Sequence, residues 1–222
     1  MRKIIRVLCP VIAIAIALGV IAGAAGAPSS TRSEIQLELG DLLFSDERYG
    51  EAISAYLLAK EGAEPDQLVR ASAGLLRSLL LAAEFNRAYQ EALFFESLDH
   101  RANPQLRTLS ADGFWGYGLF DEADRIYDEV LAEVPASPRA RHGLARSLAA
   151  RNLHTEALRE IQAAVALSPT DPVLHHTHGM ILRGLRRYDA AAEAFERYIA
   201  VVPKVRDTDQ LEWARAEVSF LR

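Results

Sequence analysis

Residues 172–205 read PVLHHTHGMILRGLRRYDAAAEAFERYIAVVPKV, and their landmarks recur in the preceding sequence at a fixed interval. Three alanines and three prolines are each spaced 34 residues apart: Ala123, Ala157 and Ala191, and Pro135, Pro169 and Pro203. This period accommodates two helices of about three turns joined by a tight turn. We therefore predict consecutive helical pairs, with the alanine where two helices cross closely and the proline between pairs.

The composition agrees with a helical chain and excludes several classes of protein. Half of the 222 residues are apolar and only 8% are aromatic, and alanine and leucine lose little side-chain freedom in a helix. The net charge of -5 and the lack of a basic cluster argue against nucleic-acid binding. The single cysteine, Cys9, excludes an intrachain disulfide and a cysteine-based metal site.

The repeated landmarks resemble those of the tetratricopeptide-repeat family. That family has a small residue at repeat position 8, rings at 17 and 24, alanines at 20 and 27, and proline at 32. Two units match well, through Gly40, Tyr49, Ala52, Tyr56 and Ala59 and through Gly179, Tyr188, Ala191, Phe195 and Pro203. The resemblance implies an all-α, right-handed α-solenoid of about five helix-turn-helix repeats over residues 33–205, and a helical bundle has no reason to repeat at this interval.

The repeat units fall at about 33–66, 67–103, 104–137, 138–171 and 172–205. The second unit is degenerate, and we expect a lengthened turn near Ala82–Phe85. Apolar residues at helical spacing in 206–222 predict a capping helix, which an open-ended stack of repeats needs.

The N-terminus has the layout of an export signal. Basic residues at positions 2, 3 and 6 precede an uncharged run, which ends in small residues up to Ala27. Residues 1–27 are expected to be a signal peptide, with cleavage after Ala24 preferred, or an uncleaved anchor in the inner membrane. Either alternative places the remainder outside the cytoplasm, in a bacterial periplasm, after a linker over 28–33.

The resemblance implies that the first helix of each pair lines a concave groove, at repeat positions 2, 5, 9 and 12. Carried over to this chain, the predicted groove residues are Asp41, Phe44, Asp112, Trp115, Arg139, His142, Arg146, His176 and Arg183. The later units are rich in arginine, whose planar fork suits a carboxylate. We therefore predict that the groove binds an acidic segment or a C-terminal carboxylate of a partner protein.

The predicted function is a scaffold or adaptor outside the cytoplasm that aids assembly of an envelope complex. The alternative is a membrane-tethered subunit of a fixed complex. A regulatory part of an enzyme is less favoured, because the repeats leave no room for a catalytic domain. His175, His176 and His178 are the one local cluster that invites a metal, but the ligand set is incomplete, so neither a metal nor a cofactor is expected.

Overall fold

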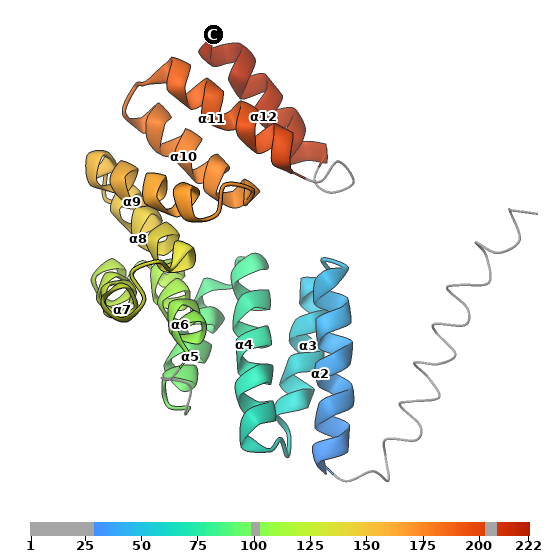
Figure 1. Cartoon of the computed structure of the whole chain (residues 1–222). Helices are drawn as coiled ribbons and strands as arrows, with labels where there is room; N and C mark the ends of the chain where they lie inside the picture. Colours follow the sequence, from blue (N-terminus) through green and yellow to red (C-terminus); the bar gives the residue numbers. More distant parts are fainter. Residues whose placement is uncertain (1–28, 99–102, 203–207) are drawn as a thin grey trace, which may run out of the picture. The chain divides into compact units, whose positions relative to one another are not determined.

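The computed structural model describes residues 29–98, 103–202 and 208–222, and all regular structure in them is helical (Figure 1). The helices are α2 (Ser29–Ser45), α3 (Tyr49–Lys60), α4 (Pro65–Leu81), α5 (Phe85–Glu96), α6 (Pro104–Tyr117), α7 (Phe120–Glu133), α8 (Pro138–Ala150), α9 (His154–Leu167), α10 (Pro172–Gly184), α11 (Tyr188–Val201) and α12 (Thr208–Leu221). The signal or anchor predicted for residues 1–27 lies outside the described part. Among the described helices, none has both the length and the apolar content needed to cross a bilayer.

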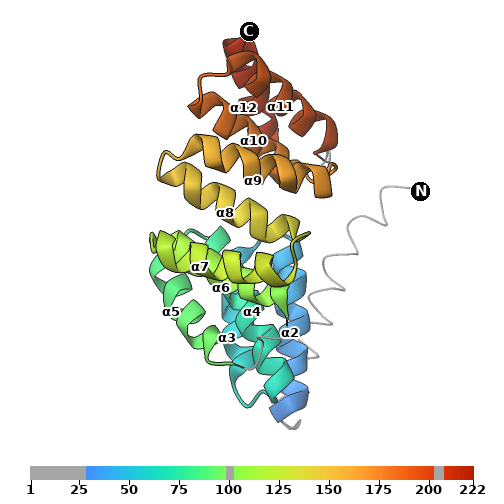
Figure 2. The ribbon, with the colours of Figure 1, turned by 60° about the vertical axis from the view of Figure 1, so that its left-hand side comes forward.

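The described helices divide between two compact units, with the boundary between residues 87 and 88 inside α5. In the first unit α2 contacts both its partner α3 and the next first helix, α4. In the second unit α6 contacts α7 and α8, α8 contacts α9 and α10, and α10 contacts α11, which α12 follows (Figure 2). Within each unit a first helix therefore touches the next first helix, and the predicted all-α fold of stacked helical pairs is confirmed.

Three of the pairs begin with the same local chemistry. The side chain of Asn103 accepts hydrogen bonds from two backbone N–H groups of α6, and Ser137 and Asp171 each accept one at the start of α8 and α10. A proline follows each cap as the first helical residue, where its missing N–H costs nothing. These Asn-Pro, Ser-Pro and Asp-Pro pairs fix where each first helix starts.

The periodic small residues lie where the helices approach most closely. The alanines of the 34-residue series are fully buried, as are the larger residues four positions later, Tyr127, Ile161 and Phe195. A Cβ atom on Gly143 would lie 2.3 Å from the Tyr127 ring, and one on Gly179 would lie 2.5 Å from the Phe195 ring. Each ring thus occupies the space that a side chain at the facing glycine would need, which explains why a large residue on one helix meets a glycine on the other.

Two sequence predictions about segment boundaries are wrong. Helix α2 begins at Ser29, so residues 29–33 are helical and are not the linker expected from their small and polar residues. Ser33 is buried, and its hydroxyl donates to the carbonyl oxygen of Ala59, which fixes this first part of α2 against α3. Burial of one side of the segment stabilises a helix that its composition does not favour.

The second pair has no lengthened turn. Residues 82–84 connect α4 to α5, a link of the same three-residue length as residues 46–48 between α2 and α3. The additional residues lie in α4, which has 17 residues, whereas α8 and α10 each have 13. Helix α4 begins at Pro65, where a capping box stabilises the extended start.

Candidate functional site

In the first unit, the two predicted groove residues contact their own helical pair and α4. The hydroxyl of Tyr56 donates a hydrogen bond of 2.7 Å to Asp41, which is otherwise exposed. The Phe44 ring packs edge-on against Tyr49, and the guanidinium of Arg77 lies 5.6 Å from the centre of the Phe44 ring. Arg77 belongs to α4, the first helix of the second repeat, and the structure brings it to the groove position of the first repeat.

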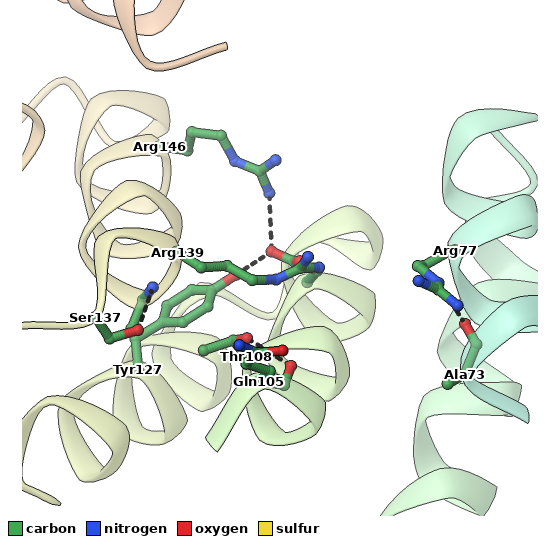
Figure 3. A network of polar contacts seen from close by, with 10 residues as sticks. Ala73, Arg77, Gln105, Thr108, Tyr127, Ser137, Arg139 and Arg146 are labelled. Atoms are coloured by element: carbon green, nitrogen blue, oxygen red, sulfur yellow. Dashed lines mark hydrogen bonds and ion pairs between the residues drawn. The ribbon is translucent and has the colours of Figure 1, made fainter. Parts of the chain in front are cut away.

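Asp112 is the centre of a polar network in the second unit. Its carboxylate accepts a hydrogen bond of 2.7 Å from the Tyr127 hydroxyl and one of 2.8 Å from Arg139. Arg146 approaches the same carboxylate at 3.4 Å, beyond the usual range of about 2.7–3.2 Å for such a bond. Figure 3 shows Tyr127, Arg139 and Arg146 converging from two neighbouring helical pairs. Two guanidinium groups therefore share one carboxylate.

The aromatic ring of Trp115 holds Arg146 in place. The guanidinium carbon lies 3.9 Å from the centre of the Trp115 ring, which is within the range of a favourable cation–π contact. The Nε atom of Arg146 is buried and has no hydrogen-bond partner among the described residues. The stack fixes the orientation of the guanidinium, while its hydrogen-bonding capacity is largely unused.

Burial keeps the Tyr127 hydroxyl in its donor form. Desolvation, followed by the charge of Asp112, raises the pKa of Tyr127 well above its ordinary value. Because the phenol stays protonated, it can only donate to the carboxylate at physiological pH. This contact fixes one oxygen of Asp112 and directs the other towards Arg139.

These residues line a pocket of about 370 Å³ on the face formed by α6, α8 and α10. We call it the groove pocket, and its lining is Asp112, Pro138, Arg139, His142, Arg146, Asp171, Val173 and Leu174. The sequence pattern assigned four of these residues to the groove, but not Asp171. In the sequence, only the Asp-Pro pair at the start of α10 indicates Asp171, and it indicates a helix cap. Val173 is exposed and adds apolar surface to the pocket beside the arginines.

His142 contributes a neutral polar group to the groove pocket. Its Nε2 atom lies 2.9 Å from the hydroxyl of Thr177 on α10. Burial, together with the positive charge of Arg146, lowers the pKa of His142 to about 4. The imidazole is therefore uncharged near neutral pH, and the cationic groups in this pocket are the two arginines.

Helix α12 engages the two predicted groove residues of the last repeat. The His176 ring contacts the rings of Tyr198 and Trp213, at centroid distances of 5.6 and 5.3 Å. Arg183 forms an ion pair of 2.6 Å with Glu217 of α12. Neither residue lines the groove pocket, because the capping helix offers them partners where another repeat would follow.

The histidine cluster has a structural explanation. His175 is buried, and its Nε2 atom lies 2.7 Å from the carbonyl oxygen of Pro169. In the described residues, no group of three or more histidine, cysteine, aspartate or glutamate side chains is arranged to hold a metal ion. The site offers hydrogen bonds, charge and apolar contact, which are the means of binding a peptide segment.

Comparisons with known proteins agree with this architecture. Two models of the tetratricopeptide repeat match residues 108–172 and 173–204. A thermophilic tetratricopeptide-repeat protein of Thermus thermophilus has a TM-score of 0.70 and 16% identity, and the match covers 85% of this chain and 98% of that chain. MamA from residue 41 onward, of Desulfovibrio magneticus RS-1, has a TM-score of 0.56 and 16% identity, with 80% and 97% covered.

At these identities the likeness to the solved structures is one of fold. A search of curated proteins found no match to the sequence. The family models cover the last three helical pairs, and the same pairing of helices extends through the described residues before them. Residues 108–204 match the tetratricopeptide-repeat family, and the described part of the chain has the fold of that family.

Proposed function

We propose that this chain is an adaptor outside the cytoplasm, which holds a partner protein by a segment bound in the groove pocket. The match to tetratricopeptide repeats supports a role as an interaction scaffold, because proteins of that family are generally non-enzymatic scaffolds. The observation that carries the proposal is the pair Arg139 and Arg146, which share the single carboxylate of Asp112 in a pocket of about 370 Å³.

The pocket favours a partner that carries a carboxylate. A guanidinium group has five N–H donors, and Asp112 takes only one from each arginine. The stack on Trp115 orders Arg146 before a ligand arrives, so that binding loses less side-chain entropy. The ligand is an acidic side chain or a chain's C-terminal carboxylate, with an apolar neighbour against Val173.

Defined peptides test this specificity. Fluorescence anisotropy would compare a glutamate-rich peptide, its amidated form and a glutamine-rich peptide of equal length on the full-length chain. We expect the glutamine peptide to bind at least about tenfold more weakly, because the charge-assisted bonds are lost. A loss of affinity on amidation identifies the C-terminal carboxylate as the bound group, and equal affinity identifies an acidic side chain.

Charge reversal locates the binding site. Arg146→Glu is expected to weaken binding of the acidic peptide at least about tenfold, because it replaces attraction by repulsion. Arg125→Glu is the matched control, because Arg125 is exposed on α7 in an ion pair with Glu129 and lies outside the pocket lining. Unchanged affinity in Arg146→Glu, or an equal loss in the control, contradicts the proposed site.

The proposed location has its own test. The basic, apolar and small-residue layout of residues 1–27 supports export, and mass spectrometry of the mature chain would show whether it begins at Ala25. Full-length chain that remains in washed membranes would support the tethered alternative. Full-length chain in the cytoplasmic fraction would contradict export.

A further inference from the structure

A second pocket lies outside the groove lining, between α9, α10 and α11. Its volume is about 220 Å³, and it shares no residue with the groove pocket. Most of its lining comes from α11 and the residue before it, with His178 and Leu182 from α10 and Gln162 from α9. We call it the α9–α11 pocket.

Two arginines at this pocket have no ionic partner within the described part of the chain. Arg187 and Arg197 are exposed, and neither forms an ion pair with a described carboxylate, unlike Arg139, Arg146 and Arg183. Glu193 also lines the pocket but pairs with neither of them. The pocket therefore carries two cations against one anion, without a direct bond between them.

The imidazole of His178, which is partly buried, is a further polar group of the pocket. The Nε2 atom of His178 is buried and has no hydrogen-bond partner among the described residues. A buried polar atom without a hydrogen-bond partner destabilises the folded chain, so a ligand that supplies a partner is favoured. Burial, and then the charges of His175 and Arg197, lower the pKa of His178 to about 4, which leaves the ring neutral.

Apart from the amide of Gln162, the remaining lining is apolar. Leu182 and Ala190 contribute hydrocarbon surface beside the arginines and the imidazole. A ligand that fills this space needs a short apolar stem and one acidic group. A planar carboxylate matches the fork of a guanidinium group by two parallel hydrogen bonds.

We propose that the α9–α11 pocket is a second binding site, which takes a carboxylate carried on a short hydrocarbon stem, as in a glutamate side chain of a second partner protein. Arg187 and Arg197 bind the carboxylate, Leu182 and Ala190 contact the stem, and His178 supplies a further hydrogen bond. The site is independent of the groove pocket, so the adaptor would hold one protein on each face.

Glutarate is the probe for this site, because it has a carboxylate at each end of a short hydrocarbon chain. The full-length chain, labelled with ¹⁵N in its histidine rings, would be titrated with glutarate and followed by NMR. We expect the His178 resonances to move, and the pKa of His178 to rise when glutarate is bound, because an added negative charge stabilises the imidazolium.

The double variant R187A/R197A is expected to lower glutarate affinity at least about tenfold, whereas R159A/R215A should change it by less than about twofold. Arg159 and Arg215 are also exposed and lie outside the pocket lining, and the control removes the same net charge. Circular dichroism would verify that both variants fold.

Three results would overturn the proposal. The first is an unmoved His178 signal, and the second is an equal loss of affinity in R159A/R215A. The third is tighter binding of inorganic phosphate than of glutarate, which would assign the pocket to a phosphoryl group. Arg146→Glu should leave glutarate binding at His178 unchanged, so failure of the groove proposal is distinguishable from failure here.

Discussion

Asp112 and Tyr127 make the same contact as Asp41 and Tyr56, across the same separation of 15 residues. The tyrosine is buried in the core of its pair, and its hydroxyl needs an acceptor where the ring reaches the groove face. In the next repeat an isoleucine, Ile161, replaces the tyrosine, and an arginine replaces the aspartate. The aspartate therefore serves the fold first, while Arg139 binds its second oxygen and Arg146 approaches the oxygen that accepts from Tyr127.

Removing the charge of Asp112 should strengthen the groove pocket. Asp112→Asn keeps an acceptor for Tyr127 but frees both arginines, and we expect affinity for the acidic peptide to rise by at least about threefold. Titration followed by fluorescence anisotropy would measure the affinity of the variant for the acidic peptide. Asp41→Asn is the matched control, since Asp41 accepts the same tyrosine bond without an ion pair to arginine in the described residues. Weaker binding in Asp112→Asn would show that the ligand is cationic.

Gly143 offers a residue-scale test of packing. A Cβ atom there would lie 2.3 Å from the buried Tyr127 ring, so Gly143→Ala is expected to lower the free energy of unfolding by about 1–3 kcal/mol. Gly50→Ala is the control, because a Cβ on Gly50 in α3 meets nothing within 4 Å. Replacing glycine inside a helix should raise stability by about 0.5–1 kcal/mol. Urea unfolding would give the free energy of unfolding of both variants, and an equal change in the two would contradict the packing argument.

At the scale of the element, the turn inside each pair reuses one backbone geometry. A residue in the left-handed region lies in every one of these turns, namely Glu47, Ala83, Gly118, Asn152 and Arg186. Only one of the five is glycine, the residue that adopts this region without steric cost. The tight turn requires this backbone conformation, and the four residues that are not glycine carry its steric cost.

This geometry predicts opposite effects for two substitutions. Ala83→Gly should raise the free energy of unfolding by up to about 1 kcal/mol, because alanine is strained at a φ of 56°. Gly118→Ala should lower it by about 1 kcal/mol or more, since a φ of 95° suits glycine alone. Denaturant midpoints of the two variants would decide, and shifts of the same sign would refute the strain argument.

At the scale of the whole molecule, buried histidines make stability depend on pH. The folded chain holds the pKa of His142 and of His178 at about 4, below the ordinary value of 6.5, chiefly through burial. Between these values the unfolded chain binds more protons than the folded chain, so stability is full above 6.5 and falls as pH is lowered towards 4.

We expect His142 alone to account for a loss of up to about 2 kcal/mol in the free energy of unfolding between pH 6.5 and pH 5. Urea unfolding at several pH values in that interval would measure this loss. Most carboxylates titrate below the interval, so they contribute little to the slope. His142→Gln should reduce the slope. A slope that is unchanged in the variant would contradict the role assigned to this ring.

Much of the architecture was predictable because the core repeats. The 34-residue spacing of alanines and prolines predicted the helical pairs, and those alanines are fully buried. The start of α2 and the length of α4 were not predictable in this way. Local composition does not reveal that Ser33 is buried against α3, and burial decides whether a marginal helix forms.

The sequence by itself determined the stack of helical pairs and which side of each first helix is polar, because the period of buried small residues fixes how neighbours pack. Only the tertiary structure decided which charges meet. Arg146 reaches Asp112 and Arg183 reaches Glu217, each across 34 residues, because stacking brings successive first helices together. A long charged side chain pairs with whichever opposite charge lies near it in space. Which arginines can still bind a ligand is therefore decided only by the packing of the helices.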